Sequence, residues 1–154
     1  MYPRILVPID DSVTSQRGFD EALELAGRLG STLHLLNVVD ARRLFAEVST
    51  HVRPEQLLAD WRAAGDRLVA RDVERARASG VSAEGVVRCE PGQRVCDTIL
   101  EEVKQSGAGL IVMGTHGRSG VRRLALGSDA ELVLRESPVP VLLVREPSLQ
   151  SATS

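Results

Sequence analysis

Short apolar runs alternate along this chain with longer stretches in which apolar residues recur at helical spacing. The apolar runs are rich in Val, Ile and Leu and are bounded by Gly, Pro, Asp or Ser, a pattern typical of buried β-strands. Five strands are therefore expected, at residues 4–9, 32–39, 81–89, 109–113 and 139–145.

The stretches between the strands predict four helices. The first ends at Gly30, because a glycine directly after the last periodic apolar residue is a common helix stop. The others are expected at about residues 54–80, 91–107 and 128–136. The polar segment 40–53 is expected to be a loop.

Strands that alternate with helices indicate an α/β fold with a parallel sheet covered by helices on both faces. A doubly wound sheet of five strands usually has the order 3-2-1-4-5 or 2-1-3-4-5. The third strand alternates apolar and polar residues most clearly, which suits a sheet edge and favours 3-2-1-4-5. We expect one domain over residues 1–147 and a flexible tail over 148–154.

The last strand is expected at the other edge, yet it is apolar throughout. An exposed apolar edge invites pairing with another chain. Pro138 and Pro140 suit the start of an edge strand. The sequence therefore predicts a symmetric homodimer through residues 139–145, with the two copies of the strand antiparallel.

The topology also predicts where a ligand binds. In open parallel sheets the binding crevice lies outside the carboxyl ends of the strands, at the switch point between strands one and four. Strand one ends in "PIDDS" and strand four in "MGTHGRSG". Asp10 and Gly114 are thus expected to lie close together.

Glycines concentrate after the fourth strand, in "GTHGRSGVRRLALGSDAEL". Gly117 allows a turn with exposed N–H groups, and Gly127 precedes the last helix. Ser128 is expected to be its N-cap, with Glu131 completing a capping box. Free N–H donors and the positive end of the dipole make a helix N-terminus a good phosphate site.

The spacing of Gly114, two residues, Gly117, nine residues and Gly127-Ser128 resembles the nucleotide-binding signature of the universal stress protein family. "ILVPIDDS" is similar to the family's first strand, "LIVMGTHGRSG" to its fourth strand and loop, and "SPVPVLLVR" to its last strand. The likeness extends over nearly the whole chain. It implies a homodimeric, ATP-binding regulator of the stress response.

The resemblance also implies the site residues. Asp10 would face the adenosine, with Pro8, Val38 and Met113 around the base. Backbone N–H groups near Gly114, His116, Gly117 and Arg118 would cradle phosphates, and Gly127, Ser128 and the amide of Asp129 would hold the outer ones. The implied set is completed by Ile9, Thr115 and Ser119. The ligand would be ATP, ADP or AMP, with Mg²⁺ or Mn²⁺ held through the phosphates.

Asp129 departs from the family, which usually has a small apolar residue at this position. A carboxylate in the first turn of a helix suits the dipole, but it would repel a terminal phosphate unless it points away or meets a divalent ion. Arg118, Arg122 and Arg123 could offset it, or could simply form a solvated basic loop.

Composition excludes several function classes. The net charge of −2 and 3% aromatic content argue against nucleic acid, although "GTHG" and "GRSG" match the GXXG pattern of KH domains. No Walker lysine, serine elbow or acid/base pair is visible, so at most slow ATP hydrolysis is expected. The open alternatives are a slow ATPase or adenylyl-transferring enzyme, and a structural dimer with a degenerate site.

The remaining features predict no further chemistry. Cys89 and Cys96 are expected to be small buried hydrophobes, and His34 a hydrogen-bonded core residue. The N-terminus lacks the pattern of a signal peptide, and no apolar stretch approaches the length of a membrane span. A cytoplasmic location without a membrane partner is therefore expected, and the sequence names no protein partner.

Overall fold

A computed structural model describes residues 1–47, 53–116 and 126–146. Its sheet has five parallel strands in the order β3-β2-β1-β4-β5, which confirms the predicted topology. The strands are β1 (Arg4–Pro8), β2 (Thr32–Val38), β3 (Ala83–Arg88), β4 (Leu110–Gly114) and β5 (Val141–Val144).

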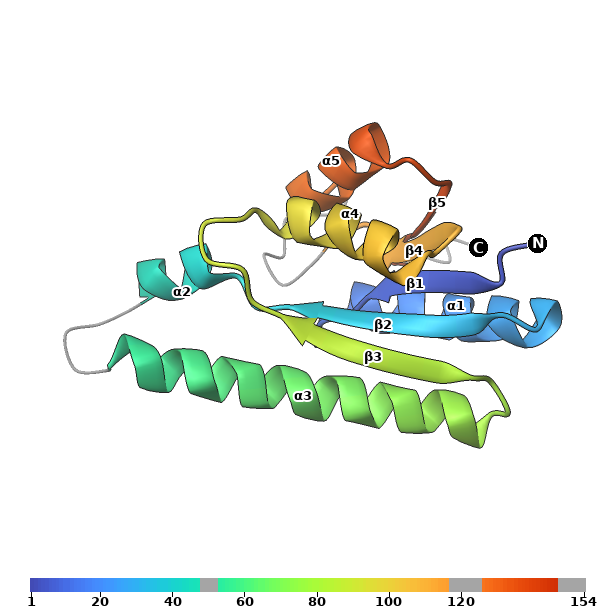
Figure 1. Cartoon of the computed structure of the whole chain (residues 1–154), viewed down its shortest axis with the longest axis horizontal. Helices are drawn as coiled ribbons and strands as arrows, with labels where there is room; N and C mark the ends of the chain where they lie inside the picture. The colour runs from blue at the N-terminus through green and yellow to red at the C-terminus, as the bar shows by residue number, and fades with distance from the viewer. Residues whose placement is uncertain (48–52, 117–125, 147–154) are drawn as a thin grey trace, which may run out of the picture.

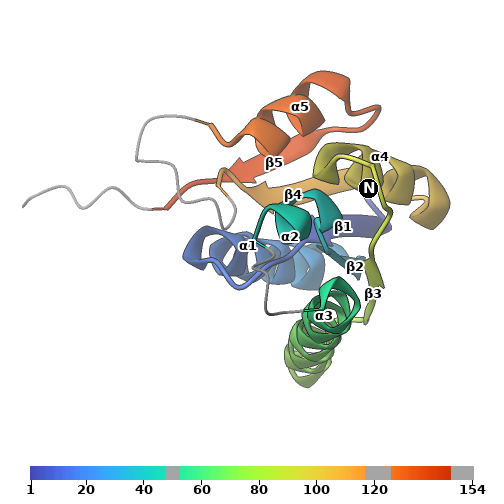
Figure 2. The ribbon, with the colours of Figure 1, turned by 90° about the vertical axis from the view of Figure 1, so that its left-hand side faces the viewer.

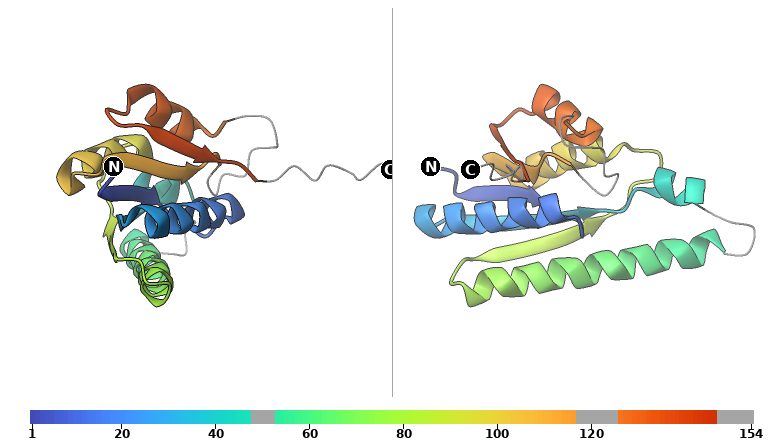
Figure 3. Two further views of the ribbon diagram at one scale, coloured as in Figure 1. Left: turned by 90° about the vertical axis from the view of Figure 1, so that its right-hand side faces the viewer. Right: turned by 180° about the vertical axis from the view of Figure 1, so that it is seen from behind.

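Helices cover both faces of the sheet (Figures 1 and 2). Figure 3 shows α1 (Val13–Leu29) and α3 (Pro54–Ala78) on one side, where their apolar residues share a core with β1 and β2. The opposite face carries α4 (Val95–Ser106) and α5 (Ser128–Glu136), whose apolar residues form a second core. The central strand β1 faces both cores, and Ile5, Leu6 and Val7 are fully buried.

The segment predicted as a polar loop contains a short helix, α2 (Ala41–Glu47), so that prediction was wrong. Asp40 stabilises its start, because the carboxylate accepts hydrogen bonds from the N–H groups of Arg42 and Arg43 at 3.0 and 3.4 Å. The side chain of Leu44, within this helix, is buried. A helix of two turns shows too few buried apolar positions for periodicity to reveal it.

The start of α4 also differs from the prediction. Pro91 and Gly92 lie in a turn, where Gly92 has a φ of 81°, and the helix begins only at Val95. Its N-cap residue, Arg94, makes no capping bond through its side chain. The predicted helix ends at Gly30 and Gly107 are confirmed, because both residues adopt the left-handed conformation after the last turn.

His34 of β2 is a hydrogen-bonded core residue, as predicted. Its ring nitrogens lie 2.9 Å from Glu84 Oε1 and 2.7 Å from Glu102 Oε1. Arg4 pairs with Glu84, and Arg88 donates to Glu102 Oε2 at 2.8 Å. We call these five residues the His34 cluster. It joins β1, β2, β3 and α4.

The two cysteines differ in burial. Cys96 is fully buried in α4, as predicted, whereas Cys89 is only half-buried. Burial raises the pKa of both thiols, and neither forms a disulfide. Nowhere in the described residues is a helix both long and apolar enough to cross a membrane.

Candidate functional site

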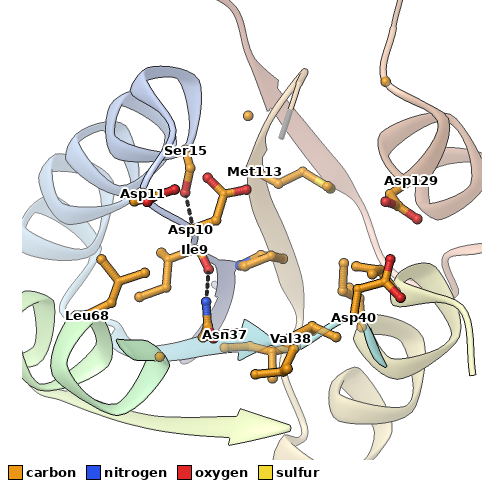
Figure 4. A pocket seen from close by; sticks show the side chains of 18 of the residues that line it. Ile9, Asp10, Asp11, Ser15, Asn37, Val38, Asp40, Leu68, Met113 and Asp129 are labelled. Carbon is orange, nitrogen blue, oxygen red and sulfur yellow. Dashed lines mark hydrogen bonds between the residues drawn. The ribbon is translucent and has the colours of Figure 1, made fainter. Parts of the chain in front are cut away.

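A cavity of about 1030 Å³ opens at the carboxyl ends of the strands, where β1 and β4 lie side by side (Figure 4). Every expected site residue that the structure describes lines it: Pro8, Ile9, Asp10, Val38, Met113, Gly114, Thr115, His116, Gly127, Ser128 and Asp129. The expected residues Gly117, Arg118 and Ser119 lie outside the described residues, as do Arg122 and Arg123.

The end of β1 is fixed by short polar contacts. The Asp10 N–H donates to Ser15 Oγ at 2.7 Å, and Asp10 Oδ1 accepts from the Ser12 N–H at 2.7 Å. Ser12 is the N-cap of α1. The Asn37 side chain donates to the carbonyl of Ile9 at 2.9 Å, which ties the end of β2 to the end of β1 (Figure 4). Asp10 is therefore held at the entry to α1.

Gly114 is a glycine because α1 passes directly against it. A Cβ at this position would lie 2.7 Å from the carbonyl oxygen of Thr14 and 3.1 Å from the backbone N of Ser15. A Cβ on Gly18 of α1 would in turn lie 3.0 Å from the backbone N of Gly114. The φ of Gly114 is not positive, so the requirement is close approach of two backbones.

Gly127 connects the far end of the glycine-rich segment back to β4. Its N–H donates to the carbonyl of Thr115 at 2.8 Å, and a Cβ would lie 2.9 Å from the same oxygen. That N–H therefore already has an acceptor within the protein.

Gly127, rather than Ser128, is the N-cap of α5, so the predicted Ser128–Glu131 capping box was wrong. The Gly127 carbonyl accepts the first helical bond, from the N–H of Glu131 at 2.9 Å. The bond to Thr115 fixes Gly127 as the last residue before the helix, which makes Ser128 the first helical one. The first turn of α5 lines the cavity, and the N-cap residue gives its N–H groups no side-chain cap.

Asp129 lies in this first turn, and its carboxylate faces the cavity. Figure 4 shows it on the same side as Asp40, with Asp10 on the opposite side. Burial, and then the charge of Asp40, raise the pKa of Asp129 above its usual value. Hydrogen bonding from the Cys96 N–H and the charges of Arg42 and Arg94 act in the opposite direction.

His116 brings an unpartnered polar atom to the cavity wall. Its Nδ1 is buried and has no hydrogen-bond partner among the described residues. Buried ring nitrogens usually have partners, so this atom is available to a bound group. The described residues contain no group of three or more His, Cys, Asp or Glu that could hold a metal ion.

Sequence reasoning missed the outer wall of the cavity. This wall comes from the helices α2, α3 and α4, and it includes Arg42, Arg43, Trp61, Arg67, Arg71 and Arg94. No motif marks these positions. Asn37 could have been found, because it is a polar residue near the end of β2, and the strand ends define the crevice.

Comparisons with known proteins agree with one another. A sequence model of the universal stress protein family matches residues 1–145. Universal stress protein YxiE of Bacillus subtilis is 32% identical over 152 residues, covering 94% of this chain and 100% of that one. The solved structure of hypothetical protein MJ0577 is similar with a TM-score of 0.84 at 22% identity, covering 96% of this chain and 99% of that one. A universal stress protein in complex with cAMP has a TM-score of 0.67 at 23% identity, covering 94% and 97%.

Proposed function

Because this chain belongs to the universal stress protein family, we propose that it is an adenine-nucleotide-binding regulator of the stress response. The observation that carries the proposal is the cavity, which joins the end of β1 to both ends of the glycine-rich segment. A family relative of similar fold was solved with cAMP, which supports an adenine nucleotide as the ligand class.

The cavity offers matching chemistry for the parts of a nucleotide. Pro8, Val38 and Met113 supply apolar contacts for the base, and the Asp10 carboxylate is positioned for the ribose or base. The phosphates would lie between the backbone N–H groups after Gly114 and those of the first turn of α5. A Mg²⁺ or Mn²⁺ ion would be held through the phosphates.

Binding, rather than turnover, is the function that these residues favour. The described cavity wall supplies one histidine, His116, with no hydrogen-bonded carboxylate beside it among the described residues. A general base normally needs such an orienting partner. The proposed activity is therefore binding with at most slow ATP hydrolysis, and turnover faster than about 1 per second would favour the enzyme instead.

Replacing Asp10 by alanine should weaken adenine-nucleotide binding at least about tenfold, because it removes both the polar contact and the turn held by Ser12. The measurement is calorimetric titration of nucleotide-stripped protein with AMP, ADP and ATP. Asp60→Asn, on the exposed side of α3, is the matched control and should bind normally. Equal affinities of the two variants would show that the nucleotide does not bind at the end of β1.

We also propose that β5 is the homodimer interface. All four residues of the strand are apolar, none is fully buried, and Leu142 is 39% exposed. Nothing pairs with the outer edge of β5 within the described chain. Two antiparallel copies would satisfy both edges and cover this surface.

Leu142→Arg should convert the dimer to a monomer, because it places a charge in an apolar interface. Light scattering at micromolar concentration measures the mass directly. Leu29→Arg, at the exposed end of α1, is the control and should leave the mass unchanged. A wild-type protein with the mass of one chain would refute the interface.

A further inference from the structure

We propose that the Asp129 carboxylate selects among adenine nucleotides by phosphate number, so that the site takes a nucleotide with one phosphate in preference to a triphosphate. The proposal rests on the proposed function, since it concerns which nucleotide enters the same cavity. Asp129 then acts as a specificity-determining residue.

The position of Asp129 carries the first step of the argument. It follows Ser128 in the first turn of α5 and lines the cavity, at the place where a chain of phosphates would meet the helix N-terminus. The dipole at this end of a helix attracts anions. Here Asp129 and Glu131 already place two carboxylates in that first turn. These carboxylates offset part of the attraction that the helix dipole would exert on an outer phosphate.

Within residues 1–47, 53–116 and 126–146, the groups around Asp129 do not neutralise its charge. Asp40 of α2 adds a second carboxylate on the same side of the cavity (Figure 4). Arg94, the N-cap residue of α4, donates two hydrogen bonds to Asp97, at 2.9 and 2.8 Å. Arg42 of α2 is the other cation whose charge acts on Asp129, and the charge of Asp40 outweighs it there.

The partial burial of Asp129 strengthens the repulsion between its carboxylate and an outer phosphate. Asp129 is half-buried, and both its burial and the charge of Asp40 disfavour its charged form, so a further negative group beside it would be opposed as well. Like charges a few ångströms apart repel each other even in a strongly screening medium. In the proposed arrangement each phosphate beyond the first would add negative charge on this side, whereas the base and the first phosphate would lie nearer Asp10 and Gly114.

A purely structural role for Asp129 makes a different prediction. Its carboxylate accepts from the Cys96 N–H, and so supplies the cap that Arg94 does not give to α4. If this were its whole role, loss of the charge would change the affinity for all nucleotides by the same factor. The ratio of the AMP and ATP affinities therefore separates the two roles.

The test is titration of the stripped full-length protein with AMP and with ATP, each with EDTA and with Mg²⁺. We expect the wild type to bind AMP more tightly than ATP. Asp129→Asn keeps an acceptor oxygen for Cys96 and should shift the ratio about tenfold toward ATP. Asp40→Asn, which keeps an equally good N-cap for α2, should shift the ratio in the same direction. Glu24→Gln, an exposed carboxylate outside the cavity lining, should leave it unchanged.

Three results would overturn the inference. An unchanged ratio in both asparagine variants would show that Asp129 only caps α4. Tighter ATP binding by the wild type, with Mg²⁺ present, would show that the carboxylates recruit a metal instead of repelling phosphate. After either of these two results the proposed function stands. The third result, absence of binding to any adenine nucleotide, would overturn the proposed function together with the inference.

Discussion

Gly114→Ala is expected to destabilise the protein by about 2 kcal/mol and to abolish tight nucleotide binding. The added Cβ would lie 2.7 and 2.8 Å from the carbonyl oxygen and carbon of Thr14. These are backbone atoms in the first turn of α1, so no flexible side chain can move aside. Helix α1 must shift, and Ser15, whose Oγ accepts from the Asp10 N–H, shifts with it.

Gly27→Ala is the matched control, because Gly27 also lies in α1 but meets only Val81 Cγ2, at 3.7 Å. This variant should be up to about 1 kcal/mol more stable than the wild type, since alanine favours a helix interior. Chemical denaturation gives both free energies of unfolding, and calorimetry gives both affinities. Normal stability and binding in Gly114→Ala would show that the glycine spacing does not reflect the contact with α1.

Glu102→Gln should lower the free energy of unfolding by about 2 kcal/mol, because Glu102 is the buried acceptor of the His34 cluster. Its side chain is 4% exposed; Oε1 contacts His34 at 2.7 Å, and Oε2 accepts the shorter of two bonds from Arg88, at 2.8 Å. A glutamine is uncharged and has an NH2 group in place of one carboxylate oxygen, so the charge-assisted bonds of the carboxylate to Arg88 are lost or weakened. Glu101→Gln, the exposed neighbour, is the control and should change stability by less than about 0.5 kcal/mol.

The same cluster should make stability depend on acidic pH. Burial alone would raise the pKa of Glu102, but the hydrogen bonds and charges of Arg88 and His34 together outweigh it and hold that pKa below its usual 4.5. The pKa of Glu84 is lowered as well, chiefly by the hydrogen bond from His34. A carboxylate with a lowered folded pKa contributes stability above its unfolded value and loses it as the pH falls through the folded value. The wild type should therefore lose more stability than Glu102→Gln between about pH 6 and pH 3. The measurement is the free energy of unfolding of both proteins as a function of pH. If the two curves are parallel, Glu102 is not the source of the pH dependence.

The sheet and its strand order could be predicted because short apolar runs separated by helical stretches leave few right-handed topologies. The α2 helix could not, because Ala41 and Leu44 are the only buried residues among positions 41–46 of it. Its start depends on the Asp40 carboxylate, and a single polar residue before a two-turn segment predicts a loop equally well.

The candidate site likewise contains residues that the sequence could predict and others that it could not. The presence of Asp10 and Gly114 in one cavity could be predicted, because the strand order alone makes the ends of β1 and β4 neighbours. The N-cap of α5 was misplaced, because the bond from Gly127 to Thr115 decides where the helix begins and joins segments that are separate in sequence. Trp61 could not be assigned to the cavity, because its place depends on how α3 lies against the sheet.

The strand order has a consequence for how this protein folds. β1 pairs with β2 early in the chain, but its other partner is β4, where Ile5 lies opposite Leu110. Pairing between such distant segments forms slowly, because the chain entropy of closing them must be lost first. The cavity does not exist until β4 has joined β1. A nucleotide can therefore recognise only the finished sheet, and it would slow unfolding without templating the earlier steps of folding.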